Sequence, residues 1–486
     1  MKRILLILGG LLLTKVYAQT SNDTVFKKRA LDNTEVNWLL SYYNQSGDHA
    51  AVTGGIGNEK LKDFAQNIQV SLPVSADHVL NVDFTVSAYT SASSSNLNPF
   101  TGASRGDDDD DDDDDDDKWL DNNTGSAITG TPWVASSGAS YKDVWLNFNA
   151  NFQHYSDDRN KIFGVSASIA DEFDYFSAGG GLDFTYIFNE KNSEISLGTN
   201  VYFDHWRPEY PTEIKTYFET GGNLNADFFK DVPIWDENGN PTVKTGNNTW
   251  RPSSEGLIEN KARNTYVLKI GFSQILSRNL QFSLFTDLTY QTGWLANPMQ
   301  RVYFADKPNY YIGNAADIPR YTSKENKGVF QLADDFERLP GKRFKFPLGL
   351  RVNYYVNEFM VLRSYYRYYT DDWGLQSHTA ELEVPLKISS GFTLYPSYRY
   401  YIQSAVKYFA PYEGHYSTRK YYTSDYDLSA FTAHQFGMGV KYTDIFTRMK
   451  WWRIGVKSIH LDLNRYVRSN GLKAFIISTN LQFVFE

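Results

Sequence analysis

Four consecutive stretches between Phe344 and Gln403 alternate apolar and polar residues with a period of two. In the first of them Phe346 and Leu348 lie on one face and Arg351 on the other. Such a period places successive side chains on opposite faces of a β-sheet. A soluble sandwich would not line its core with Arg, Lys and Glu, whereas a membrane barrel combines an apolar outside with a polar lumen. The pattern predicts an all-β fold, a transmembrane antiparallel β-barrel.

The same alternation predicts sixteen strands in the whole chain. Besides the four strands between 344 and 403, they span 34–43, 63–74, 79–90, 141–152, 162–170, 178–188, 195–206, 264–275, 280–290, 432–442, 455–467 and 473–485. An even number is the rule for single-chain bacterial barrels. The long connections follow strands 3, 7, 9 and 13 and therefore all lie on one side. Long outer loops and short periplasmic turns produce this asymmetry, so 91–140, 207–262 and 291–342 are predicted to be large extracellular loops.

The N-terminus resembles a secretory signal. A basic Met1-Lys2-Arg3 start precedes about ten apolar residues and a small-residue site that ends at Ala18. The apolar run is shorter than the roughly 20 residues of a membrane-spanning helix. We therefore predict a signal peptide at 1–18, a periplasmic tail at 19–33, and a barrel at 34–486 in the outer membrane of a Gram-negative bacterium. The absence of cysteine excludes disulfides and thiolate metal sites.

Several local motifs resemble one known family. They are Leu339-Pro340-Gly341-Lys342-Arg343, Leu350-Arg351-Val352-Asn353-Tyr354-Tyr355, Tyr366-Arg367-Tyr368-Tyr369-Thr370-Asp371-Asp372-Trp373-Gly374, Ser377-His378-Thr379-Ala380-Glu381, Tyr398-Arg399-Tyr400-Tyr401 and Tyr422-Thr423-Ser424-Asp425-Tyr426-Asp427-Leu428-Ser429. Together they are similar to the domain-of-unknown-function 3570 family of exported Gram-negative proteins. The resemblance covers most of the chain after the signal and implies an outer-membrane barrel. It implies no particular activity, so function has to be argued from the residues.

Charged residues on the polar face of the four central strands form a predicted lumen charge network. Its members are Arg351, Arg363, Arg367, Glu381, Glu383 and Arg399. Short turns set the register, so we expect Arg367 beside Glu381 and Arg399 close to Glu381. A positively biased constriction would select anions. A paired network would instead fill and stiffen the barrel, since buried charges need partners and barrels of this size often hold side chains or loops. We favour the filled lumen.

An unbroken run of eleven aspartates lies in the predicted loop 91–140. It consists of Asp107, Asp108, Asp109, Asp110, Asp111, Asp112, Asp113, Asp114, Asp115, Asp116 and Asp117. Without the signal the formal net charge changes from −9 to −12, and this run accounts for nearly all of it. Carboxylates attract Ca²⁺, which takes six to eight oxygen ligands at about 2.4 Å. A uniform run has no turn that wraps an ion, so we expect loosely bound Ca²⁺ on a self-repelling tract and no specific metal site.

The same loop contains two Thr/Ser-Gly-Ala-Ser tetrapeptides that end at Ser104 and Ser140. They are similar to the core at which flavin transferases attach FMN to the last hydroxyl. Asn98 and Val134 occupy the position where that core usually has an acidic residue three places upstream. Linkers rich in Ser, Gly and Ala produce such tetrapeptides by chance. The linker interpretation is favoured, and covalent FMN remains a remote alternative.

No pattern in the sequence predicts a catalytic site. Ser377 and His378 are adjacent, but neighbours on a strand point to opposite faces and cannot form a nucleophile–base contact. We therefore expect a protein that is not an enzyme. Nucleic-acid binding is disfavoured because a basic patch is lacking and the acidic loop would repel phosphate.

Two classes of function follow from these patterns. The favoured one is a structural or surface-binding component with a largely filled lumen. Loops 207–262 and 291–342 would fold over the mouth of the barrel and present the interface, since they are rich in the aromatic residues that interfaces favour. Its expected partners are outer-membrane lipids, lipopolysaccharide, and outer-membrane proteins or lipoproteins. The alternative is an anion-preferring channel or transporter. We also expect Leu350, Leu382 and Leu394 to face lipid. The wall opposite the charge network is expected to carry less charge, with Lys269 and Asp287 facing inward on strands 8 and 9.

Overall fold

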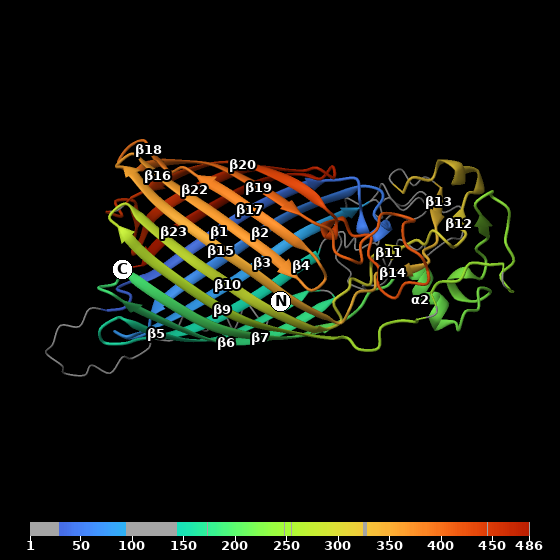
Figure 1. The fold of residues 1–486 in the computed structure, drawn as a ribbon, viewed down its shortest axis with the longest axis horizontal. Helices are drawn as coiled ribbons and strands as arrows, with labels where there is room; N and C mark the ends of the chain where they lie inside the picture. Colours follow the sequence, from blue (N-terminus) through green and yellow to red (C-terminus); the bar gives the residue numbers. More distant parts are fainter. Residues whose placement is uncertain are drawn as a thin grey trace.

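A computed structural model describes residues 29–93, 143–172, 174–246, 248–253, 255–323, 328–444 and 446–485. Sixteen long antiparallel strands close into one barrel, in which β1 pairs with β23 (Figure 1). They are β1 (Thr34–Ser46), β2 (Glu59–Pro73), β3 (His78–Ser93), β4 (Asp143–Tyr155), β5 (Lys161–Glu172), β6 (Tyr175–Phe188), β7 (Ser193–Trp206), β9 (Ala262–Ser277), β10 (Leu280–Gly293), β15 (Lys342–Asn357), β16 (Met360–Asp371), β17 (Gln376–Glu383), β19 (Phe392–Gln403), β20 (Phe431–Thr443), β22 (Ile454–Arg468) and β23 (Lys473–Phe485). The two-residue pieces β18 (Leu386–Lys387) and β21 (Lys450–Trp451) join the same sheet. The predicted fold class and strand number are confirmed.

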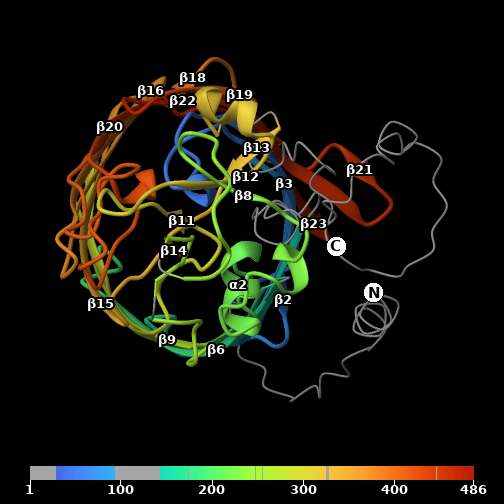
Figure 2. The ribbon, with the colours of Figure 1, turned by 90° about the vertical axis from the view of Figure 1, so that its right-hand side faces the viewer.

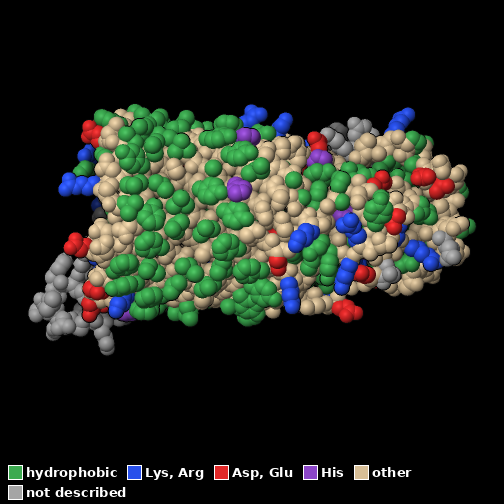
Figure 3. Space-filling model, in the orientation of Figure 1, with side chains coloured by type: hydrophobic (Ala, Val, Ile, Leu, Met, Phe, Trp, Pro, Cys, Tyr) green, Lys and Arg blue, Asp and Glu red, His purple; other side chains and the backbone are tan. Residues whose placement is uncertain are grey.

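The barrel carries its apolar residues on the outside. Figure 3 shows a band of hydrophobic side chains over the strands. Leu382 lies opposite Tyr398, and both side chains are exposed on this outer face. Leu350 lies opposite Leu284, which is also exposed there. Leu394 pairs with Val440, which faces the same way. Lipid takes the place of a protein core around such a surface. Among the described residues, no helix has the length and apolarity needed to cross a membrane.

The connections divide by length between the two ends of the barrel. Most turns at one end are short, such as 189–192 between β6 and β7 and 278–279 between β9 and β10. The long segments 207–261, 294–341 and 404–430 all lie at the other end. By the loop asymmetry of transmembrane barrels, we expect the long-segment end to be the outer end and the short-turn end to be periplasmic.

The outer segments fold together into a compact structure that we call the cap. It comprises the described residues of 47–58, 207–261, 294–341 and 404–430 and lies at the right-hand end of the barrel in Figure 1. Its elements are η1 (Ala51–Thr53), α2 (Thr212–Glu219), η3 (Asp227–Phe229), β8 (Ile234–Asp236), β11 (Arg301–Val302), β12 (Tyr310–Gly313), η4 (Ala315–Arg320), β13 (Val329–Gln331), β14 (Asp335–Phe336) and η5 (Tyr426–Leu428). Strands β8, β12 and β13 form one small sheet, and β11 and β14 form another.

The main hydrophobic core of the molecule lies in the cap. Phe229, Ile312, Phe330 and Phe336 are fully buried in one cluster, and further aromatic side chains pack around them. The cap projects into water, so its apolar side chains must bury one another. The barrel is under no such requirement because lipid surrounds it.

Candidate functional site

The structure pairs four of the predicted lumen charges across neighbouring strands. Nη1 of Arg363 lies 2.8 Å from Oε1 of Glu383, and Nη2 of Arg399 lies 2.6 Å from Oε2 of Glu381. The Arg351 guanidinium instead lies over the rings of Phe285 and Tyr365, at 5.0 and 5.7 Å. The six predicted residues therefore share one wall of the lumen, on β15, β16, β17 and β19.

Arg367 does not lie beside Glu381 as predicted. It lies opposite Thr379, and Glu381 lies opposite Tyr365 and Arg399. The turn between β16 and β17 determines this register. Asp371 accepts a hydrogen bond from the Leu375 amide at 3.0 Å, and Gly374 adopts a φ of +91°. A left-handed glycine in a tight turn fixes the pairing, two residues away from the expected register.

The side chains of the charge network are accessible to water. The Arg363 side chain is 50% exposed and the Glu383 side chain 28% exposed. A cavity of about 170 Å³ lies against the network, lined by Arg351, Arg363, Tyr365 and Glu381 among others. The network side chains therefore do not fill the barrel at this level, in contrast to the interpretation that we favoured from the sequence.

The opposite wall is acidic. Asp83 accepts hydrogen bonds from Asn67 and Gln69, both at 2.9 Å, and Asp63 accepts one from Ser87 at 2.6 Å. These residues lie on β2 and β3, and β3 is eight strands from β16 in the closed sixteen-strand ring. The assignment of the opposite wall to strands 8 and 9, with Lys269 and Asp287, is wrong, because β9 and β10 lie beside β15 in the ring. Residue alternation combined with the strand order would have identified β2 and β3 instead, since this requires only that the barrel close.

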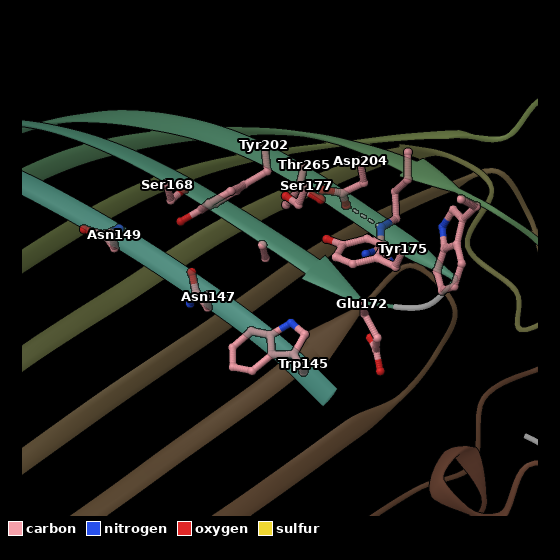
Figure 4. A pocket seen from close by; sticks show the side chains of 13 residues that line it. Trp145, Asn147, Asn149, Ser168, Glu172, Tyr175, Ser177, Tyr202, Asp204 and Thr265 are labelled. Carbon is pink, nitrogen blue, oxygen red and sulfur yellow. Dashed lines mark hydrogen bonds and ion pairs between the residues drawn. The ribbon is translucent and has the colours of Figure 1, made fainter. Parts of the chain in front are cut away.

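A second cavity, of about 440 Å³, lies at the outer ends of β4, β5, β6, β7 and β9. We call it the rim cavity. Its lining combines aromatic rings with amide, hydroxyl and charged groups, as Figure 4 shows. The lining includes Trp145, Asn147, Asn149, Ser168, Glu172, Tyr175, Ser177, Tyr202, Asp204, Trp206, Arg263 and Thr265. No pattern in the sequence indicates this site, because its residues come from five strands and none forms a local motif.

An ion pair fixes the rim cavity at its outer edge. Nε of Arg263 lies 2.7 Å from Oδ2 of Asp204, whose side chain is almost fully buried. The same guanidinium lies over the rings of Tyr175 and Trp206, at 5.1 and 5.2 Å. Those two rings meet edge to face at 5.4 Å. Cation–π and edge-to-face contacts hold such rings in defined orientations.

Gly179 shapes the floor of the rim cavity. A Cβ at this position would come within 2.4 Å of the Tyr202 ring. The missing side chain therefore allows Tyr202 to lie flat along the wall and to present a ring face toward the cavity. Neighbouring amides from Asn147 and Asn149 offer both donors and acceptors. Ring faces beside amides suit a ligand with apolar C–H faces and many hydroxyls.

A buried ion pair holds the cap together. Nε of Arg301 donates to Oε1 of Glu213 at 2.9 Å, and both side chains are fully buried. Arg301 Nη1 also donates to the Val52 carbonyl at 2.9 Å. Residue 52 belongs to the β1–β2 connection, which lies inside the ring of strands in Figure 2. One guanidinium thus connects three separate outer segments.

Another ion pair connects the cap to the barrel rim. Arg468, at the outer end of β22, pairs with Asp427 of η5. Within the cap, Arg338 pairs with Asp335 at 2.8 Å, and Asp335 also accepts the Tyr422 hydroxyl. Gln403 of β19 also donates to the Asp427 carbonyl at 2.9 Å, so the cap is attached to the barrel at β19 and β22.

Two buried cap carboxyls have perturbed proton affinities. Burial raises the pKa of Glu337 to about 8 and that of Asp334 to about 7. Asp334 accepts the Phe304 amide at 2.8 Å, and Glu337 accepts the Asn297 amide at 2.7 Å. Burial disfavours the charged form of a carboxyl, so folding of the cap favours the protonated forms of Asp334 and Glu337.

The remaining predicted sites are not tested by the structure. The run Asp107 to Asp117 and the two serines Ser104 and Ser140 lie outside the described residues. Within the described part of the chain, no group of three or more His, Asp or Glu side chains is arranged to hold a metal ion. Ser377 is buried, whereas His378 is exposed and lies 2.7 Å from the Tyr366 hydroxyl. The two side chains point to opposite faces, as predicted.

Comparison with family models identifies the chain. The model described as "Protein of unknown function (DUF3570)" matches residues 5–473. The chain belongs to this family. The resemblance predicted from the sequence motifs is thereby confirmed. No curated protein matches the chain.

Several solved barrels are similar to this family member over nearly its whole length. A structure described as a bacterial polysaccharide outer membrane secretin has 8% identity and a TM-score of 0.39, over 93% of this chain and 99% of that one. OccK9 (OpdG) of Pseudomonas aeruginosa has 7% identity and a TM-score of 0.36, over 93% and 98%. A TodX monoaromatic hydrocarbon channel mutant has 10% identity and a TM-score of 0.36, over 94% and 91%.

Proposed function

We propose that this family member is a non-enzymatic, surface-binding component of the outer membrane. In this proposal the barrel is a scaffold, the cap covers its mouth, and the rim cavity takes a ligand rich in hydroxyls, such as an oligosaccharide chain. The observation that carries the proposal is the cap itself. It has its own hydrophobic core and is centred on the fully buried Arg301–Glu213 pair.

The contacts of the cap favour a fixed cover over a swinging lid. Breaking a buried ion pair by separating its partners leaves uncompensated charges, at a cost of about 3–5 kcal/mol. Moving the cap would also disrupt the Arg301 bond to Val52 and the Arg468–Asp427 pair. Rigid attachment suits a binding surface that must keep its shape.

The rim cavity lies where the cap meets the barrel. Segment 207–261 begins directly after Trp206 and ends at Lys261, whose carbonyl accepts the Trp206 amide at 2.8 Å. Trp145, Tyr175 and Tyr202 supply ring faces that can stack on sugar C–H groups. Asn147, Asp204 and Arg263 supply planar polar groups for pairs of neighbouring hydroxyls.

Tryptophan fluorescence of the purified protein tests this proposal. Titration with maltoheptaose and with an acidic oligouronate should change the emission, and Trp145→Ala should abolish most of the change. Tyr365→Ala is the matched control, because Tyr365 is a lumen aromatic beside the charge network and outside the rim cavity. Equal loss in both variants, or no response to either sugar class, would contradict a carbohydrate site.

A channel remains the second candidate, and the charge distribution of the lumen favours it. Arg351 and Arg367 make no salt bridge within the described residues, which supports a preference for anions. The acidic wall at Asp63 and Asp83 opposes that preference, so selectivity would be weak. Planar-bilayer recording separates the candidates. The capped scaffold predicts little conductance, and a steady open pore in the unmodified protein would overturn it.

A further inference from the structure

The hairpin between β20 and β22 exposes the most accessible large apolar side chains among the described residues. Trp452 is 86% exposed, Trp451 82% and Phe446 73%. The most exposed leucine on the outer face of the barrel, Leu182, reaches 62%. Isolated exposed apolar residues are ordinary, but adjacent aromatic side chains indicate a surface that contacts something apolar.

Hydrogen bonds hold this hairpin in a defined shape. The buried Asp444 carboxylate accepts the amides of Arg448 and Met449, at 2.7 and 3.2 Å. β21 pairs with the start of β22, and Trp452 at the tip has a φ of +55°. The two tryptophans therefore lie on an ordered turn, so the backbone of this turn loses little conformational entropy when the tryptophans bind.

The hairpin lies at the periplasmic end, beside the lipid-facing surface. In Figure 2, viewed toward the cap, β21 lies outside the ring of barrel strands. The adjacent outer face is aromatic, since the Phe392 and Tyr442 rings meet at 5.1 Å and Phe485 is exposed next to the hairpin base. The apolar surface of the barrel therefore continues into the hairpin.

Cationic residues alternate with the aromatic ones in this turn. Arg448, Lys450 and Arg453 accompany Phe446 and the two tryptophans. The Arg448 guanidinium lies 5.5 Å from the centre of the Phe446 ring. Tryptophan concentrates at membrane–water interfaces, and basic residues beside a membrane attract anionic lipid headgroups.

We propose that this hairpin is a lipid anchor that places Phe446, Trp451 and Trp452 in the headgroup region of the periplasmic leaflet. Its basic side chains contact lipid phosphates. A periplasmic protein partner is the competing occupant. Continuity with the lipid-facing belt and the lateral position of β21 favour lipid.

Because the chain has no cysteine, a single introduced thiol can report the depth of the hairpin. Phe446→Cys keeps both tryptophans and receives a nitroxide label in nanodiscs of phosphatidylethanolamine with phosphatidylglycerol. We expect the label to be more accessible to oxygen than to a water-soluble nickel chelate. Glu190→Cys is the matched control, because residue 190 lies in the short periplasmic turn 189–192. Its label should show the opposite preference.

A second variant tests whether the tryptophans cause the insertion. Adding Trp451→Ser and Trp452→Ser to Phe446→Cys should shift the label to the aqueous pattern of the control. A label at 446 that is as accessible to nickel as the control in the nanodiscs would overturn the proposal. Protection that occurs only in native membranes and not in nanodiscs would also overturn it, and would identify a protein partner instead.

Discussion

Two Arg–Glu pairs of the same chemistry lie in contrasting parts of this molecule. In the cap, Arg301 and Glu213 are both fully buried. In the lumen, the side chains of Arg363 and Glu383 are 50% and 28% exposed. The buried pair connects three chain segments, whereas the exposed pair joins two strands that are already hydrogen-bonded. The N–O distances of the two pairs are similar, so the exposure of the side chains to water decides how much each pair contributes to stability.

The two regions also place their apolar residues in opposite ways. The cap buries Phe229, Phe330 and Phe336 as a soluble domain does. The barrel presents Leu182 and Leu382 to the outside and keeps charges within. One chain therefore contains a cap that folds as a soluble domain does and a barrel whose apolar face is turned to lipid. The two regions should differ in their sensitivity to mutation.

The largest effect is expected in the cap. Glu213→Gln removes the buried carboxylate that pairs with Arg301 and should destabilise the cap by about 3–5 kcal/mol. Limited proteolysis of segments 207–261 and 294–341 measures this loss. The double variant Arg301→Met with Glu213→Leu removes both charges and should recover much of the stability, because well-packed apolar side chains can replace a buried pair.

A control for this experiment is the exposed rim pair of Arg207 and Asp171, 3.4 Å apart. Arg207→Gln should cost less than about 1 kcal/mol. Similar protease sensitivity in Glu213→Gln and Arg207→Gln would contradict the assigned role of the buried pair.

The barrel should respond most to a charge on its lipid face. Leu382→Arg at an outward position should impair assembly by about 2–4 kcal/mol. Thr379→Arg introduces the same side chain on the lumen face of the same strand and should be tolerated. Heat-modifiable migration of the folded barrel on gels reports assembly. Equal tolerance at both positions would disprove that Leu382 faces lipid and Thr379 faces the lumen.

The cap should weaken as pH rises. The folded-state pKa of Glu337 is raised to about 8 from its usual value of 4.5. A raised pKa stabilises the fold fully below the unfolded pKa, and this stability is lost as pH rises through the folded pKa. Raising the pH from 6 to 8 should cost about 2 kcal/mol. Glu337→Gln should reduce the pH dependence of the thermal unfolding of the cap. An unchanged pH profile in this variant would argue against Glu337 as its source.

The smallest effect is expected for the lumen pair. Arg363→Gln should change stability by about 0–1 kcal/mol, since the pair is exposed to water in the lumen. Melting in detergent measures this change. A loss comparable to that of Glu213→Gln would mean that the lumen is packed after all, and would remove the contrast between the two regions.

Much of the barrel follows from the sequence alone. Period-two alternation determines which residues face lipid, because the side-chain period of a strand is the same wherever the strand lies. Turn positions and connection lengths then determine the strand number and the outer end. Leu382 and Glu381 could thus be assigned to opposite faces without any knowledge of their neighbours.

Tertiary structure decided what depends on contacts between distant segments. The turn at Gly374 selected the register that places Arg367 opposite Thr379 and separates it from Glu381. Closure of the ring placed Asp83 across from β16, and packing of remote segments brought Arg301 to Glu213 and Val52. Alternation is a local property of the backbone, whereas partners across a lumen or within a cap are determined by how the whole chain closes and packs.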